Sequence, residues 1–288
     1  MKAAITKENI SIKDERLDID HIDQYLLSFF IAPHQCELAI FDERKKRLMM
    51  LESISMDPDR PLLENLKEIH YEHILISAGF WKRVEVTLRN QLFCQVPNSL
   101  YSGEQAYDYL KLNAPTQPLE EKYLSTLDEA QECTTVFSVP HELIRWFDGK
   151  YPKPMINFRH ESAHFLKATF EQLDSKLKHQ LFINLTGAGM QLAGYAKGKL
   201  SIYNQFKVQS AGQVAKMILL SIQQFSNEGQ ATPITLWGLD HEVRQSLPTL
   251  KKYYKGLKTG ERPRGVKIAH TFDVFKEYEY FDVLSSFA

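Results

Sequence analysis

Residues 181–208 constrain the fold of this chain more than any other segment. They contain three apolar runs that are separated by the small-residue turn 186–189 and by the pair Lys197-Gly198. Apolar runs of this length between glycine-containing turns predict a three-stranded antiparallel meander. Gly198 supplies the positive φ angle of a tight hairpin turn. The glycines of the first turn leave backbone N–H groups accessible to a ligand, or they simply allow the strands to turn sharply.

The segment after the meander predicts a helix, a strand and a second helix. Ser210 and Gln213 have the spacing of a capping box, in which two side chains satisfy the free amides at a helix start. Residues 233–237 form a short apolar run that is typical of a buried strand, and residues 242–254 have a helical pattern. The order of elements is therefore βββαβα.

The same order is predicted earlier in the chain, with strands at 27–31, 37–41 and 47–54, a helix after Asp57 and a strand at 83–88. A repeated order of this kind predicts an α/β fold with two ribonuclease-H-like halves around a central cleft, where ligands bind at the strand ends. We expect a polar N-terminal arm over residues 1–23, a first half over 24–150 and a second half over 151–288.

Three further segments complete the prediction. The arm carries Ile10, Ile12, Leu17 and Ile19, which suit an edge strand. Residues 119–129 are expected to form a helix, and Pro140 is expected at the start of another, because proline tolerates a first helical turn. The aromatic tail 272–287 favours an edge strand packed on a sheet, with a partner-docking segment as the alternative.

Four segments of the chain carry a resemblance to known proteins. They read LSFFIAPHQCELAIFD, QVPNSLYSGEQAYDYLKLN, the meander that ends in NQFKV, and ITLWGLDHEV continuing to KKYYK. The second half resembles that of actin-like ATPases, a superfamily that includes sugar kinases, chaperones and pilus and secretion assembly proteins. The whole chain is similar to a bacterial family of unknown function with an actin-like fold.

The resemblance implies a nucleotide site and shows where this chain departs from it. Thr186, Gly187 and Gly189 lie in the turn that corresponds to the phosphate-binding turn, although Thr186 stands where the family has a glycine, and Gly238 matches the first glycine of the adenosine motif. The chain has neutral or bulkier residues at other positions of these motifs: Phe30 and Asn184 stand where ATPases have acidic residues, and Ala32, Pro33, Ala188 and Leu239 replace glycines or disturb the turns. Metal-dependent hydrolysis needs those charges.

These departures predict a non-catalytic actin-like scaffold or assembly protein with a degenerate nucleotide site, a pseudo-ATPase that acts through other proteins and can form a homodimer. The alternative is a nucleotide-binding actin-like protein that binds ATP and has weak ATPase activity. We expect no resident cofactor for the scaffold.

A third hypothesis comes from His160-Glu161-Ser162-Ala163-His164, which matches the zinc-peptidase motif H-E-x-x-H. Against it, residues 155–158 predict a strand, which would place His160 at a strand-to-helix junction and spoil the helical spacing of the two histidines. The alternative is a partly exposed helix start.

Composition excludes several classes of protein. The chain is 43% hydrophobic, with a formal net charge of -1, so a disordered protein is excluded and nucleic acid is a disfavoured partner. The three cysteines are widely spaced and fit neither a disulfide framework nor a zinc ribbon. No apolar run is long enough to span a bilayer, and the charged N-terminus lacks a signal sequence, so we expect a cytoplasmic protein.

Overall fold

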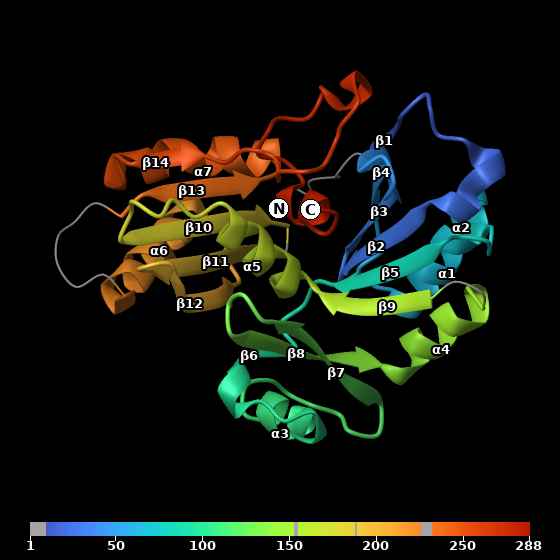
Figure 1. Ribbon diagram of the computed structural model, residues 1–288, viewed down its shortest axis with the longest axis horizontal. Helices are drawn as coiled ribbons and strands as arrows, with labels where there is room; N and C mark the ends of the chain where they lie inside the picture. Colours follow the sequence, from blue (N-terminus) through green and yellow to red (C-terminus); the bar gives the residue numbers. More distant parts are fainter. Residues whose placement is uncertain (1–9, 153–154, 188, 226–231) are drawn as a thin grey trace.

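Two lobes lie side by side, with helix α5 and the C-terminal segment between them (Figure 1). The computed structural model describes residues 10–152, 155–187, 189–225 and 232–288. Residues 1–9 of the expected arm and Ala188 of the expected phosphate turn therefore lie outside the described residues. No helix in these four ranges is long and apolar enough to cross a membrane.

The first lobe is built on a six-stranded sheet. Its order is β1 Ile10–Lys13, β4 Arg47–Ser55, β3 Gln35–Asp42, β2 Leu26–Ala32, β5 Arg83–Leu88 and β9 Met155–His160. Every residue of β2 is buried, as expected for a central strand that is covered on both faces. The expected edge strand of the arm is confirmed at Ile10 and Ile12, because β1 pairs antiparallel with β4. Leu17 lies outside this strand, and Ile19 begins the 3₁₀ helix Ile19–Gln24. The helices α1 Leu62–Glu72 and α2 Ile74–Ser77 follow β4.

The second lobe contains a five-stranded sheet whose order is β12 Lys199–Phe206, β11 Gly189–Ala196, β10 His179–Thr186, β13 Ile234–Gly238 and β14 Leu257–Thr259. The predicted meander is β10–β12, and the helices α6 Ala211–Phe225 and α7 Asp240–Tyr253 follow as expected. Ser210 Oγ accepts a hydrogen bond from the backbone N–H of Gln213, so the predicted helix cap is present. Setting β1 aside, both sheets have the same pattern: a meander with two further parallel strands beside its first strand.

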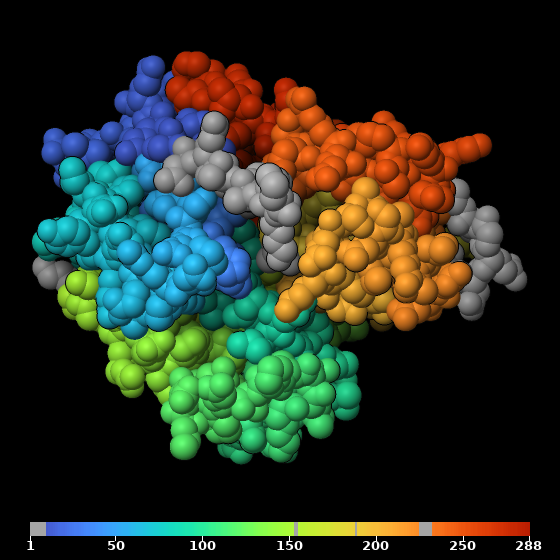
Figure 2. Space-filling model, turned by 180° about the vertical axis from the view of Figure 1, so that it is seen from behind, coloured from blue at the N-terminus to red at the C-terminus, as the bar shows by residue number. Residues whose placement is uncertain are grey.

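A small three-stranded sheet is inserted between β5 and β9. Its order is β6 Phe93–Pro97, β8 Cys133–Pro140 and β7 Glu121–Asp128. Helix α3 Ala106–Lys111 packs on it. Helix α4 His141–Lys150 begins directly after Pro140, as predicted. Figure 2 shows the insertion, in green, below the two lobes. The predicted helix at 119–129 is wrong, because residues 121–128 of this segment form β7 and pair with β8.

The connection between the lobes runs through α5 Glu161–Glu171. Strand β9 pairs with β5 of the first sheet, so sheet pairing changes from the first lobe to the second after His160. The division of the chain at residue 150 stays a prediction. The aromatic tail does not form the expected edge strand. It contains the 3₁₀ helix His270–Phe272 and α8 Phe281–Ser285, which is buried throughout, because both lobes pack against its apolar side chains.

Candidate functional site

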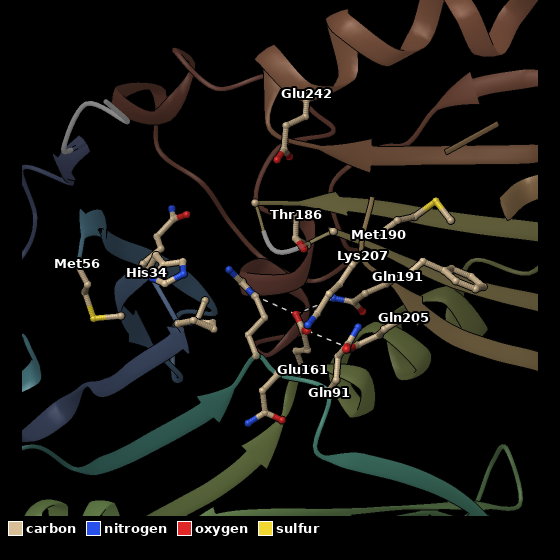
Figure 3. A pocket seen from close by; sticks show the side chains of 18 of the residues that line it. His34, Met56, Gln91, Glu161, Thr186, Met190, Gln191, Gln205, Lys207 and Glu242 are labelled. Carbon is tan, nitrogen blue, oxygen red and sulfur yellow. Dashed lines mark hydrogen bonds and ion pairs between the residues drawn. The ribbon is translucent and has the colours of Figure 1, made fainter. Parts of the chain in front are cut away.

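A cavity of about 820 Å³ lies between the two lobes, at the carboxyl ends of β2, β5 and β10. This is where open α/β sheets place ligands, and the volume is typical of small-molecule sites. Both lobes and α5 contribute to its lining, which consists of Ala32, Pro33, His34, Gln35, Ser55, Met56, Arg89, Asn90, Gln91, Glu161, Thr186, Gly187, Gly189, Met190, Gln191, Gln205, Phe206, Lys207, His241 and Glu242. Figure 3 shows His34 and Met56 on one side and Met190 and Lys207 on the other.

The floor of the cavity is organised by Arg89, which directly follows β5. Its guanidinium donates to Glu37 on β3 at 2.9 Å, to Glu161 at the start of α5 at 3.0 Å, and to Asp282 on α8. All four side chains are less than a tenth exposed. Charge-assisted hydrogen bonds of this kind satisfy buried ions that would otherwise be very costly.

Two glutamine side chains complete the coordination of Glu161. Gln191 Nε2 donates to one carboxylate oxygen at 2.7 Å, and Gln205 Nε2 donates to the other at 3.0 Å (Figure 3). Burial raises the pKa of Glu161 to about 8, although the Arg89 guanidinium opposes this shift. Burial alone would lower the pKa of Arg89, but its three carboxylate partners raise it, so the guanidinium stays charged.

The structure brings the predicted nucleotide residues to one region. Thr186, Gly187 and Gly189 line the cavity. Gly238 lines a side cavity of about 20 Å³, which also contacts Thr186 and Gly187. Their role in binding phosphate or adenosine stays a prediction.

The packing of two of these glycines explains why glycine is needed there. Gly189 has a φ of +146°, and a Cβ atom added to it would lie 2.1 Å from the Phe206 carbonyl oxygen. Gly238 has the same φ, and its Cβ would lie 2.8 Å from Leu185. The Gly238 amide also donates to the Tyr278 carbonyl at 3.0 Å, so it is already occupied. Neighbouring residues of the chain therefore fill the space beside both glycines, and the Tyr278 carbonyl binds the Gly238 amide.

The two positions where ATPases have acidic residues carry different chemistry here. Phe30 is fully buried in β2, and the Arg89 guanidinium lies 6.0 Å from its ring centroid. Asn184 is 2% exposed, lines the side cavity, and its Nδ2 has no hydrogen-bond partner among the described residues. A side cavity of this size holds about one water molecule, which would satisfy that donor.

The residues of the H-E-x-x-H motif do not converge on one point. His160 ends β9, as the strand prediction required; its Nε2 donates to the Asn90 carbonyl at 3.0 Å, and its Nδ1 contacts the Ser162 hydroxyl at 2.8 Å. His164 Nε2 lies 3.1 Å from the Thr87 hydroxyl. Burial lowers the pKa of both histidines to about 3, so both are neutral.

The expectation of a partly exposed helix start is therefore wrong. The start of α5 is buried, because this helix packs between the lobes. Within the described ranges, no three His, Cys, Asp or Glu side chains are grouped so that they could hold a metal ion.

Sequence reasoning missed the ion cluster. Glu161 was considered only as part of the zinc-peptidase motif, and Asp282 lies in the aromatic tail without a signal of its own. Arg89 did carry a signal, since a charged residue directly after an apolar strand lies where ligands bind in α/β sheets.

Comparisons with known proteins place this architecture. The chain is similar to a Bacteroides thetaiotaomicron protein with an actin-like ATPase fold and unknown function, with a TM-score of 0.78 and 16% identity over 94% of this chain and 98% of that one. It is also similar to a chain of the PilM–PilN type IV pilus biogenesis complex, with a TM-score of 0.58 and 12% identity over 91% and 97% of the two chains. The predicted actin-like α/β fold is therefore confirmed.

Sequence matching gives the family. No curated protein matches the chain. Residues 14–257 match the family described as "Protein of unknown function (DUF3822)", which covers most of both lobes. The chain therefore belongs to this family of unknown function, and it has an actin-like ATPase fold.

Proposed function

We propose that this protein is a non-catalytic actin-like scaffold or assembly protein, which acts in the cytoplasm by binding other proteins and holds a degenerate nucleotide site. The main observation behind the proposal is that the carboxylates on the floor of the cavity are already bound to Arg89. Glu37, Glu161 and Asp282 all accept hydrogen bonds from Arg89. Magnesium in phosphoryl-transfer sites is held by carboxylates with open lone pairs, and these three are already engaged by a cation.

The charge of the cavity also disfavours a triphosphate. Its lining and that of the side cavity include two basic side chains, Arg89 and Lys207, against four acidic ones: Glu37, Glu161, Glu242 and Asp282. The balance remains negative even when Glu161 is protonated. A strongly negative ligand is repelled by such a surface unless a metal ion compensates it.

Calorimetric titration of ATP and ADP, with and without Mg²⁺, tests the proposal together with an assay of phosphate release. We expect neither Mg²⁺-dependent binding nor turnover. If binding is detected, Lys207→Ala and Lys216→Ala separate its sources, because Lys207 lines the cavity and Lys216 is exposed on α6. Micromolar, Mg²⁺-dependent binding with turnover that is lost only in Lys207→Ala would overturn the proposal in favour of an actin-like ATPase.

The partner side of the proposal is supported by the resemblance to a chain of the PilM–PilN complex, whose name describes an assembly of proteins. Crosslinking and affinity purification from the native host would identify the partner. The tag belongs at the N-terminus, because α8 near the C-terminus is buried. We expect the partner to be retained in EDTA without nucleotide, whereas release by EDTA would contradict a metal-independent scaffold. Light scattering on the purified chain would determine whether it forms the homodimer.

A further inference from the structure

Arg89 joins four segments that are far apart in the sequence. Its partners Glu37, Glu161 and Asp282 are 52, 72 and 193 residues away from it. They lie on β3 of the first sheet, at the start of α5, and on α8. Helices α5 and α8 pack against each other between the two sheets, so this one side chain ties both inter-lobe helices to the first lobe.

The second lobe is attached to the same cluster through Glu161. Its two carboxylate oxygens accept from Gln191 on β11 and Gln205 on β12, both in the second sheet. One oxygen also accepts from Arg89 on the first-lobe side. A rotation of the lobes that separated these groups would leave a buried carboxylate or guanidinium without a partner, which is strongly unfavourable.

Apolar packing around α8 acts in the same direction. Phe281 stacks on Trp237 of the second sheet, with ring centroids 4.0 Å apart. Val283 and Leu284 pack on the first sheet in a cluster that contains Phe30. Asp282, which binds Arg89, lies between these two contacts in the sequence, so α8 is wedged between the lobes.

We propose that Arg89 and Glu161 form an inter-lobe clamp, which holds the two lobes at one fixed angle whether or not the cavity is occupied. The clamp consists of Arg89, its three carboxylate partners, Gln191 and Gln205. It goes beyond the proposed scaffold function, because it concerns the geometry of the lobes and would hold for an ATPase as well. A scaffold with this clamp presents a constant surface to its partners.

Distance measurements between spin labels test the clamp. Glu72→Cys at the end of α1 and Lys216→Cys on α6 place exposed labels on the two lobes, in a Cys133→Ser background, since Cys36 and Cys94 are buried. Double electron–electron resonance should give one narrow distance distribution, unchanged by Mg²⁺-ATP. Glu161→Gln replaces one of the two acceptor oxygens by an NH2 donor, which faces the Nε2 donor of either Gln191 or Gln205, and should broaden the distribution at least twofold.

Glu52→Gln is the matched control. Glu52 is also a buried carboxylate, and its partners His73 and Ser11 both belong to the first lobe. This variant should leave the distribution narrow. Equal broadening in both variants, or none in Glu161→Gln, would overturn the clamp. If Glu161→Gln fails to fold by circular dichroism, Gln205→Ala replaces it and is judged by the same two outcomes, because it removes one second-lobe donor and leaves every charge in place.

Discussion

Replacing Arg89 by methionine should destabilise the protein in a manner that depends strongly on pH. The substitution keeps much of the side-chain volume but removes the donors to Glu37, Glu161 and Asp282. Breaking a buried ion pair by deleting one partner costs about 3–5 kcal/mol, because the other charge stays buried and uncompensated.

The magnitude can be worked from the protonation of the stranded carboxyl groups. A glutamate with an unperturbed pKa of about 4.3 must be held protonated at pH 7.5, which costs about 4 kcal/mol at about 1.36 kcal/mol per pKa unit. At pH 5 the same step costs about 1 kcal/mol. Glu161 adds little to this difference, because burial raises its pKa to about 8 even with Arg89 present. The difference comes from Glu37 and Asp282, which are left buried without their cation and must take up a proton, so the variant is most stable at low pH and loses stability as pH rises. The penalty of Arg89→Met should therefore grow from pH 5 to pH 8.

Urea unfolding followed by circular dichroism at pH 5, 6.5 and 8 measures the effect on the free energy of unfolding. Arg60→Met is the control, because Arg60 is half exposed and pairs with Asp57 and Glu68 at the surface. The control should cost less than about 1 kcal/mol at every pH. A penalty for Arg89→Met that is equally small, or the same at pH 5 and pH 8, would refute the account of the cluster as a compensated buried charge.

Three further substitutions should lower the free energy of unfolding. Gly189→Ala should cost about 3 kcal/mol in urea unfolding, from a positive φ and a clash with the Phe206 carbonyl, whereas Gly198→Ala, with open space around it, should cost about 1–2 kcal/mol. Glu52→Gln should lower the free energy of unfolding by about 2 kcal/mol at pH 7. Burial alone would raise the pKa of Glu52, but the hydrogen bonds from His73 and Ser11 outweigh burial and lower this pKa to about 2. The loss of stability should therefore be present above the unfolded pKa and vanish as pH falls through 2. Phe281→Ala should lower the free energy of unfolding by about 4 kcal/mol, whereas the exposed Val274→Ala should change it very little. Similar unfolding midpoints for the two glycine variants, or for Phe281→Ala and Val274→Ala, would contradict the packing described.

Local sequence patterns predicted the elements whose causes are local. The meander β10–β12 follows from apolar runs and from Gly198, whose φ of +77° completes the hairpin. Helix α4 starts directly after Pro140, and the α6 cap uses Ser210 and Gln213, because these signals act within a few residues. Such features are readable without knowledge of the rest of the fold.

Tertiary contacts decided the segments where the prediction was wrong. Residues 121–128 begin with good helix formers, yet pairing with β8 makes them a strand. The aromatic tail suggested an edge strand, but Phe281, Val283 and Leu284 are buried as a helix because two sheets cover it from opposite sides. The Arg89 cluster belongs to the same class, since its partners come together only through the fold.

The glycines of the cavity show that packing can require the same residue as a functional motif. Gly189 and Gly238 match positions of a nucleotide site, but in this chain each makes room for neighbouring residues, and the Gly238 amide binds Tyr278. Selection for packing alone would keep both glycines. The charged groups differ from those that the resemblance implies: Phe30 packs beneath Arg89, and the floor carboxylates are bound to that cation. The glycines of the motif are thus explained by packing, and the rearranged charges are the feature that bears on whether the cavity can bind a metal nucleotide.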